Sequence, residues 1–346
     1  MNHKKVVVAM SGGIDSSTAL FLLLKQGFKP VGLSLQIPKW KQRSNIDDLN
    51  RAKRVCQKFK VKHFVIRGET DFEKQVIDYF IKELRQARTP NPCIICNRYF
   101  KLAKLYQFAK KIKAEFVATG HYAKKDYDSK NKKYLLLQAK DKLKDQSYYL
   151  ALLTQKWLKT ILFPLGDLTK DEVCQIAQKN GYRSLISPNQ SQDFCYLKNQ
   201  QLPAFLKKKL GQKSGPIINH QGQILGRHKG QHFYTIGQRK RINLPQGPFY
   251  VKEVFKNKVM VSQNQKDIFK NQAIIYPYHF ISNLKLDNKI NIKAKVRYRQ
   301  PLSKASLQPF NSKLKIIFKN KQRAIAPGQY CVFYQKNICL GGGRIN

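Results

Sequence analysis

Acidic residues are scarce in this chain of 346 residues, because Asp and Glu together number 20 whereas Lys and Arg number 66, which gives a formal net charge of +46. Long apolar runs are absent, so no segment is expected to cross a membrane. A glycine turn interrupts the first apolar stretch and excludes the apolar core of a secretory signal peptide. We therefore expect a cytoplasmic protein without a membrane partner.

The excess of positive charge predicts a polyanionic partner, and RNA is the simplest candidate. The lysines are spread along the whole chain and form no single patch. Abundant Lys, Asn and Ile also indicate an AT-rich genome, which raises the lysine content of every protein. Both explanations stay open, so the charge supports RNA binding without locating it.

The cysteines lack the pattern of a disulfide framework or of a closed zinc site. There are seven, and in a cytosolic protein they do not indicate a framework of structural disulfides, because thiols stay reduced there. Cys93 and Cys96 have Cys-x-x-Cys spacing, but no second such pair and no His pair accompanies them. A redox pair or ligands of a cluster remain open. Because these cysteines precede an expected helix and lie near Arg98 and Lys101, we expect a lowered thiol pKa.

The hydrophobic pattern of the first third alternates between strand and helix. Strands are predicted at 5–9, 30–35, 61–66 and 115–119, and helices at 16–26, 46–59, 71–86 and 99–112. This alternation predicts an α/β domain, a parallel sheet with helices on both faces. A capping box at Thr169 predicts one more helix. Ligands of such sheets bind at the carboxyl ends of the strands, where residues 11–17, Leu35 and Gly120 would converge.

The pattern changes near Leu202, where short alternating stretches such as 231–236 and 249–254 begin. The later runs 289–297, 314–318 and 329–334 are typical of a small antiparallel β-barrel. We therefore divide the chain into an α/β domain at 1–203, a small central module at 204–270 and a C-terminal antiparallel β-barrel at 271–346.

The most informative segment is Ser-Gly-Gly-Ile-Asp-Ser-Ser at 11–17, between an apolar strand and an apolar helix. Its glycines let the backbone approach a ligand closely, and the helix start offers free N–H groups to an anion. No Gly-Lys-Ser/Thr follows, so this is not the kinase-type loop and no lysine reaches a terminal phosphate. The segment predicts nucleotide binding, with Asp15 able to hold Mg²⁺; the alternative is an ordinary capped helix.

This loop resembles that of the pyrophosphatase-loop ATPases, which split ATP into AMP and pyrophosphate and use the adenylate to activate a substrate oxygen. Over nearly its whole length the chain resembles the tRNA-specific 2-thiouridylases. Nine segments in family order carry the resemblance, at 11–17, 89–97, 118–123, 144–150, 163–166, 191–197, 234–239, 296–299 and 326–329. It implies an adenine nucleotide alpha-hydrolase-like fold and ATP-dependent 2-thiolation of the wobble uridine of tRNA.

The resemblance also assigns roles to residues. The implied ATP-binding residues are Ala9, Met10, Ser11, Gly12, Gly13, Ile14, Asp15, Ser16, Ser17, Leu35 and Gly120. The residues that match segments contacting the target base and its strand are Asn91, Pro92, Cys93, Lys144, Asp145 and Gln146. Further implied tRNA contacts are His121, Arg297, Tyr298 and Gln329.

The resemblance makes Cys96 the nucleophile and Cys195 the persulfide carrier of a sulfur transfer. Adenylation would turn the uridine 2-oxygen into a leaving group, and the Cys195 persulfide would supply sulfur. Attack by Cys96 would leave a Cys96–Cys195 disulfide for a cellular reductant. A sulfur-relay protein or a cysteine desulfurase is the implied donor. The base must leave the anticodon stack; Tyr122, Tyr148 and Tyr149 either line its pocket or pack in the core.

This chain departs from the family at Cys93, where many relatives carry an aspartate that is a candidate base. Acid–base help would then come from Asp145 or from water. Cys93, Cys96 and Cys195 could instead hold an iron–sulfur cluster with an open iron. The loop after Leu35 is shorter and more basic than expected, which affects the Mg²⁺ or partner binding expected there.

Two other functions fit parts of the sequence. Another adenylating enzyme, such as an amidating ligase, would use the same loop but needs no persulfide carrier, so Cys96 and Cys195 favour the thiolase. A non-catalytic RNA-binding protein with a relic loop is disfavoured because the loop keeps Asp15 and all of its serines.

Overall fold

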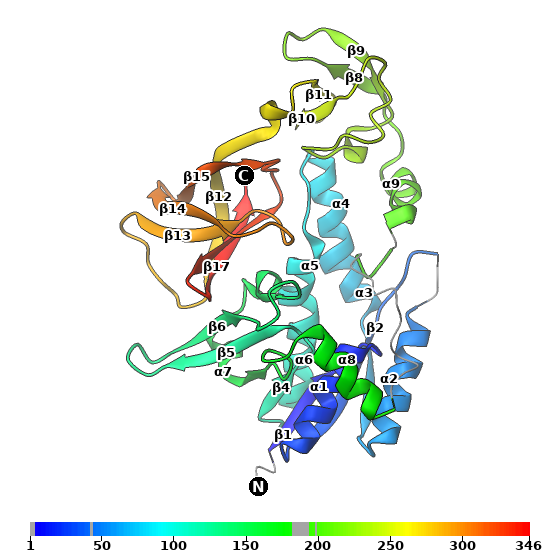
Figure 1. The fold of residues 1–346 in the computed structure, drawn as a ribbon. Coiled ribbons are helices and arrows are strands. Elements are labelled where there is room, and N and C mark those ends of the chain that lie inside the picture. The colour runs from blue at the N-terminus through cyan, green and yellow to red at the C-terminus, as the bar shows by residue number, and fades with distance from the viewer. Residues whose placement is uncertain (1–3, 42–43, 182–193, 198) are drawn as a thin grey trace.

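A five-stranded parallel sheet organises the N-terminal half of the chain (Figure 1). The computed structural model describes residues 4–41, 44–181, 194–197 and 199–346. The strands, in the spatial order β3-β2-β1-β4-β7, are His63–Arg67, Lys29–Gln36, Lys5–Ala9, Phe116–Ala118 and Ile161–Leu162. The predicted parallel sheet is confirmed. The two-residue β7 gave too short a pattern to be predicted.

Helices cover both faces of this sheet, as predicted. α1 (Ile14–Lys25), α2 (Ile46–Lys58) and α8 (Lys170–Lys179) pack with the same core as Val6 and Val8. α6 (Leu102–Lys111) packs with Val7, which points to the opposite face. Because successive side chains of a strand alternate between faces, this buried β1 contributes to two cores at once.

Two longer helical runs each contain a π-helical segment. The first joins α3 (Glu69–Phe72), a π segment at Glu73–Ile77 and α4 (Asp78–Arg85). The second joins α5 (Pro92–Ile95), a π segment at Cys96–Lys101 and α6. The predicted start of this second helix at residue 99 was wrong. Pro92 occupies the first turn and Asn91 caps it, its Oδ1 accepting the Ile94 N–H at 3.3 Å.

The middle of the chain combines short helices with a small sheet. The helices are a 3-10 turn at Ser147–Leu150, α7 (Gln155–Thr160), a 3-10 turn at Asn199–Gln201 and α9 (Leu202–Leu210). The four-stranded sheet, in the order β10-β11-β8-β9, contains Tyr250–Val254, Val259–Ser262, Gly215–Ile218 and Ile224–His228. The alternating stretch 231–236 is not a strand, because a 3-10 turn occupies Gln231–Phe233. Another 3-10 turn lies at Gln265–Ile268.

The C-terminal strands close into the predicted antiparallel barrel. The six strands, in the order β12-β15-β14-β13-β16-β17, are Phe269–Phe280, Lys313–Arg323, Ser303–Phe310, Ile290–Lys295, Tyr330–Gln335 and Ile338–Ile345. Pairing of β12 with β17 closes the ring, which removes the exposed edges of an open sheet. Buried residues such as Ile292, Leu307, Ile316 and Phe333 fill its interior.

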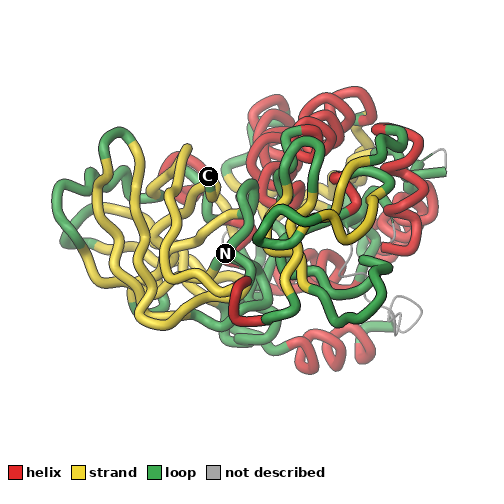
Figure 2. Tube along the Cα trace, turned by 90° about the horizontal axis from the view of Figure 1, so that it is seen from above, coloured by secondary structure: helices red, strands yellow, loops and turns green. Residues whose placement is uncertain are grey.

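A hairpin that the sequence analysis did not predict joins the barrel to the α/β domain. It consists of β5 (Ala123–Asp128) and β6 (Lys133–Gln138), and Leu137 of β6 pairs with Ile338 of β17. The two units also share one hydrophobic core, to which Leu136, Val332 and Tyr334 contribute. Figure 2 shows the barrel strands directly beside the helical part. The predicted divisions at 203/204 and 270/271 fall inside α9 and β12, and the division into domains stays a prediction.

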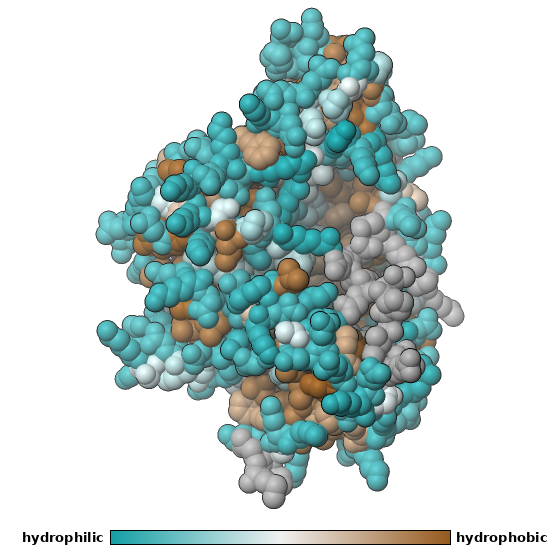
Figure 3. Space-filling view, in the orientation of Figure 1, coloured by the Kyte–Doolittle hydropathy of each residue, from teal (hydrophilic) through white to brown (hydrophobic). Residues whose placement is uncertain are grey.

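The surface reflects the composition. Hydrophilic side chains cover most of the face in Figure 3, with isolated apolar areas between them. Among the helices within the described ranges, none is long and apolar enough to cross a membrane.

A buried ionic contact links α4 to the last barrel strand. Glu83 is 3% exposed, and its Oε1 accepts hydrogen bonds from Arg344 at 3.1 Å and from Arg88 at 3.4 Å. Removing one partner of a buried ionic group leaves the others without charge compensation, which is strongly destabilising.

We expect Glu83→Ala to lower the free energy of unfolding by about 3 kcal/mol, because two arginines lose their shared carboxylate. Glu253→Ala is the matched control, since Glu253 pairs with Lys270 at the surface at 3.5 Å and such pairs contribute less than about 1 kcal/mol. Urea unfolding of both variants measures the difference. Equal losses would show that the Glu83 contact does not hold the barrel in place.

Candidate active site

The predicted nucleotide loop leads directly into α1. Gly13 precedes the helix in an extended conformation, and no side chain caps its N-terminus. Instead, the loop hydroxyls bond within the loop: Ser16 Oγ and Ser17 Oγ donate to the Gly13 carbonyl at 3.0 and 2.9 Å. Ser11 N–H donates to Ser16 Oγ at 3.2 Å. The helix N-terminus is therefore left open toward an anion.

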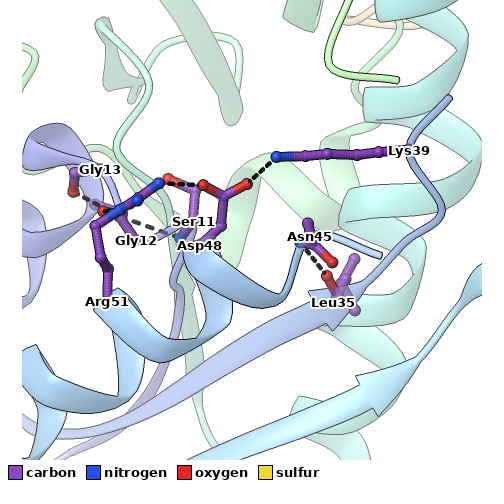
Figure 4. Close-up of polar contacts among 9 residues, drawn as sticks. Ser11, Gly12, Gly13, Leu35, Lys39, Asn45, Asp48 and Arg51 are labelled. Carbon is purple, nitrogen blue, oxygen red and sulfur yellow. Dashed lines mark hydrogen bonds and ion pairs between the residues drawn. The ribbon is translucent and has the colours of Figure 1, made fainter. Parts of the chain in front are cut away.

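One wall of the loop is the first turn of α2 (Figure 4). Gly12 has a φ of +72°, and a Cβ there would lie 2.1 Å from the Asp48 carbonyl oxygen, so only glycine fits. Arg51 Nε donates to the Gly12 carbonyl at 3.2 Å, and its guanidinium also contacts the carboxylate of Asp48. Lys39 pairs with the other Asp48 oxygen at 2.8 Å. Sequence analysis missed Arg51, because its neighbours in the sequence carry no nucleotide-binding motif.

Leu35, the expected adenine contact, lies next to the loop at the end of β2. Its carbonyl accepts a hydrogen bond from Asn45 Nδ2 at 3.1 Å, and Asn45 Oδ1 accepts the Ile37 N–H at 3.0 Å (Figure 4). Asn45 thereby fixes the chain that follows β2. No sequence pattern predicts the contact of Asn45 with Leu35, because the two residues are ten positions apart.

The opposite wall of the loop is formed by Gly120. A Cβ on this glycine would lie 2.8 Å from the backbone nitrogen of Ser16 and 2.8 Å from the carbonyl carbon of Asp15. The end of β4 therefore lies directly against the start of α1, as expected for a parallel sheet.

Asp15 receives two hydrogen bonds on one carboxylate oxygen. Tyr122 OH donates to Oδ1 at 2.9 Å, and Lys170 Nζ donates to the same atom at 2.5 Å. No lysine follows the loop in the adjacent sequence. In the folded chain, however, Lys170 reaches the loop from 155 residues away. The only sequence signal for its position was the capping box, which begins α8 at this residue.

The cysteine segments meet in a separate aromatic core. Cys96 is 3% exposed and packs in one cluster with Phe72, Phe100, Tyr196 and Phe205. Because Tyr196 is anchored in this cluster, the adjacent exposed Cys195 is held at the edge of the core that contains Cys96.

Further contacts fix the segment that carries Cys195. The Trp40 N–H donates to the Tyr196 carbonyl at 2.8 Å. The ring of Phe194 lies 5.6 Å from that of Phe80. Residues 191–193 of the predicted Cys195 motif lie outside the described residues.

The pKa values of Cys93 and Cys96 respond to burial and also to the neighbouring Cys195 and Lys101. Burial raises the pKa of Cys96, and Lys101 opposes this rise without overcoming it. Burial, followed by Cys195, raises the pKa of Cys93 to about 11. The expected lowering of the thiol pKa was wrong, because the helix start and the neighbouring cations do not compensate for the loss of water around the thiols.

Lys101, which is exposed, influences the pKa of the cysteines and also that of His121. Desolvation works against the charge of Lys101, but Cys96 first and then Cys195 and Cys93 outweigh it, so that its pKa is raised. Burial, followed by Lys101, lowers the pKa of His121 to about 3. His121 follows Gly120 directly and is neutral at physiological pH, its Nδ1 lying 2.9 Å from Thr119 Oγ1.

Two metal groups were expected from the sequence, a Mg²⁺ ion at Asp15 and an iron–sulfur cluster at the cysteines. Asp15 is partly exposed and uses only Oδ1 in hydrogen bonds, so its carboxylate fits a Mg²⁺ that accompanies nucleotide phosphates. Over the described ranges, no group of three or more His, Cys, Asp or Glu side chains is arranged to hold a metal ion. Within these ranges Cys93, Cys96 and Cys195 belong to no such group, and the iron–sulfur cluster that the sequence left open stays a prediction.

The expected tRNA contacts around the target base differ in accessibility. Asp145 is 2% exposed and accepts hydrogen bonds from the Ala139 N–H at 3.1 Å and from Ser147 Oγ at 2.9 Å, so it organises its own turn. Gln146 Oε1 accepts the Tyr122 N–H at 3.0 Å. This contact connects the turn to Tyr122, whose hydroxyl donates to Asp15. Lys144 is half-buried in the same turn.

The aromatic candidates separate into core and surface. Tyr122 and Tyr148 are almost fully buried and belong to the core. Tyr149 is half-buried, and its ring lies 4.4 Å from that of Tyr298. Burial and then Cys93 raise the pKa of Tyr149.

The remaining tRNA-contact candidates, Gln329 and Arg297, form hydrogen bonds between different parts of the chain. Gln329 Nε2 donates to the carbonyls of Thr89 and Pro90, each at 3.1 Å, directly before the capping residue Asn91. Arg297 donates to the carbonyls of Ile236 and Ala324, each at 3.1 Å. Both side chains therefore hold the accessory parts against one another and against the cysteine helix.

Comparison with known proteins gives consistent matches. Three family models cover the chain in sequence: a tRNA methyl transferase HUP domain at residues 4–199, a tRNA methyl transferase PRC-barrel domain at 203–263 and an aminomethyltransferase beta-barrel domain at 270–345. The structure is also similar to the U34-tRNA thiolase NcsA from Methanococcus maripaludis, with a TM-score of 0.38, 20% identity and coverage of 60% of this chain and 68% of that one. That likeness is too slight to support an argument.

Full-length relatives are much more similar. The tRNA-specific 2-thiouridylase MnmA 1 of Thermoanaerobacter pseudethanolicus is 40% identical over 359 residues, with 99% of this chain and 98% of that protein covered. The tRNA-specific 2-thiouridylase MnmA of Clostridium perfringens is 38% identical over 361 residues, with 100% and 99% covered. The chain therefore belongs to the family of the tRNA-specific 2-thiouridylases.

Proposed function

We propose that this chain catalyses ATP-dependent 2-thiolation of the wobble uridine of tRNA. The observation that carries the proposal is the continuity between two sites. Gly120 lies against the nucleotide loop. Leu35, the expected adenine contact, packs against the hydrophobic cluster that contains Cys96 and Tyr196, the neighbour of Cys195. An adenylating site and a pair of thiols are thus adjacent, as sulfur transfer to an activated base requires.

The nucleotide site suits the first half of the reaction. The uncapped start of α1 offers N–H groups to the phosphates of ATP, and Asp15 would hold the accompanying Mg²⁺, which neutralises phosphate charge. The uridine 2-oxygen would attack the α-phosphorus of ATP, and pyrophosphate would leave. The base then carries AMP as a good leaving group at carbon 2.

The thiols suit the second half. Cys195 is exposed, so a donor such as a sulfur-relay protein or a cysteine desulfurase can load it with a persulfide. The terminal persulfide sulfur would attack carbon 2 and expel AMP. Cys96 would lose its proton and attack Cys195 Sγ, forming a Cys96–Cys195 disulfide and releasing 2-thiouridine. A dithiol reductant then supplies two electrons and two protons to restore both thiols.

The tRNA would be held by positive charge and by stacking. Tyr149 and Tyr298 form an aromatic pair on which a base flipped out of the anticodon would stack. Asn91 and Pro92, which begin the helix that carries Cys93, and His121, which follows Gly120, would contact the same strand. Lys144, Gln146, Arg297 and Gln329 would act close to the bound strand, the last two mainly by holding the surrounding loops.

Cys195→Ser and Cys96→Ser should each abolish 2-thiouridine formation, because the first removes the persulfide and the second the attacking thiol. Binding of ATP and tRNA should stay within about twofold of wild type, a change of less than 1 kcal/mol. Nucleoside analysis of tRNA after incubation with ATP, Mg²⁺ and a persulfide donor measures the product. Cys174→Ala, on α8, is the control and should retain activity. Thiolation by Cys195→Ser would contradict the mechanism.

The raised pKa of Cys96 predicts a pH-dependent reactivity. Below pH 9 this cysteine should react with iodoacetamide at least about tenfold more slowly than the exposed Cys195, with a rate that rises with pH, since only the thiolate reacts. Mass spectrometry of the two peptides between pH 6 and pH 9 measures the rates. Lys101→Met should slow Cys96 further, whereas Lys110→Met, at the exposed end of α6, should not. A pH-independent rate at Cys96 would overturn the assignment.

Binding of tRNA should weaken steeply with salt, because lysine–phosphate contacts release counterions. With about six such contacts the affinity should fall about 1000-fold between 50 and 200 mM salt. Filter binding at a series of salt concentrations gives the slope. A flat response would mean that the charge of +46 reflects genomic bias and no tRNA footprint.

A further inference from the structure

Cys93 is a second thiol on the helix that carries Cys96, and the reaction proposed above gives it no role. Pro92 begins α5 behind the capping residue Asn91, so Cys93 lies in the first helical turn. Cys96 follows three residues later with a φ of −58° and a ψ of −45°, and its N–H bonds to the Cys93 and Pro92 carbonyls. The backbone is therefore helical from one cysteine to the other.

The spacing of Cys93 and Cys96 suits a disulfide. Residues three apart on a helix are neighbours on one face, and the rise and radius of an α-helix place their Cα atoms about 5 Å apart. A disulfide bridges Cα atoms that are about 4.4–6.8 Å apart. These two cysteines can therefore be joined while the backbone stays as it is.

The three cysteines of the site differ in their contact with solvent. Cys195 is exposed, Cys93 is half-buried and Cys96 is 3% exposed. Cys96 packs in one hydrophobic cluster with Tyr196, the neighbour of Cys195. The buried Cys96 sulfur thus has one thiol beside it on its own helix and another at the edge of its hydrophobic cluster.

We propose that Cys93 resolves the Cys96–Cys195 disulfide that sulfur transfer leaves behind, an inference that rests on the proposed function. Cys93 loses its proton to water and bonds to Cys96 Sγ. The bond between Cys96 and Cys195 breaks, and Cys195 Sγ keeps the electron pair and takes up a proton. This exchange consumes no reductant. A dithiol reductant then supplies two electrons and two protons to the Cys93–Cys96 disulfide.

Two physical reasons favour this exchange. A thiol on the same helix has an effective concentration far above that of a reductant in solution, because its approach costs no translational entropy. The negative charge of the leaving sulfur forms on the exposed Cys195, where water solvates it, whereas a neutral disulfide is left at the buried Cys96. The exchange frees the sulfur carrier, so a new persulfide can be loaded before any reductant has acted.

Mapping the disulfide after one turnover tests this role. Wild type, Cys93→Ser and Cys174→Ser are loaded with one sulfur from glutathione persulfide, mixed with ATP, Mg²⁺ and tRNA without reductant, and quenched with N-ethylmaleimide. Peptide mass spectrometry then counts each disulfide per 2-thiouridine formed. In wild type and in Cys174→Ser, the control on α8, Cys93–Cys96 should exceed Cys96–Cys195 at least about tenfold. Cys93→Ser should contain Cys96–Cys195 alone.

The wild-type protein decides the outcome even if Cys93→Ser folds poorly. Wild type that forms 2-thiouridine but contains only the Cys96–Cys195 disulfide would overturn the inference and leave the proposed function standing. Iron that is held by the three cysteines and required for thiolation would also overturn it, since ligated sulfurs are not free to exchange. A loaded wild type that forms no 2-thiouridine would contradict the proposed function itself.

Discussion

The turn at residues 88–92 is the constraint on which the arrangement of the site depends. The Thr89 N–H donates to the Pro327 carbonyl at 2.7 Å, and Gln329 holds the next carbonyls from the same barrel segment. Thr89 Oγ1 lies 2.6 Å from Thr235 Oγ1 of the central module. Asn91 and Pro92 then start the helix that carries both Cys93 and Cys96. Contacts with the barrel and the central module therefore determine where the helix that carries these cysteines begins.

The nucleotide loop combines carboxylates and cations in pairs. Asp48 is paired with Lys39 and Arg51, and Asp15 with Lys170, so both of these carboxylates at the loop are compensated. The chain has a large excess of lysine and arginine. At the loop, the two aspartates restrain basic side chains that could otherwise point into solvent. The site holds positive charge in fixed positions before any anion arrives, which reduces the reorganisation needed on binding.

What could be predicted from the sequence was whatever a continuous segment determines. The loop at 11–17, the alternation of strands and helices and the capping box at Thr169 are local patterns, and each lies where expected. The contact of Lys170 with Asp15 could not be predicted, because only the folded chain brings them together. The pKa of Cys96 was misjudged for the same reason, since its burial comes from α4, α9 and the segment around Tyr196.

The hairpin of β5 and β6 belongs to two structural units at once. Its first strand follows Tyr122, the partner of Asp15, and its second strand extends the barrel sheet through β17. The barrel is therefore not an exchangeable module in a protein-engineering sense. A chimera that replaces it with a barrel from another protein must also reproduce the edge of β17, or β6 loses its pairing partner in the barrel.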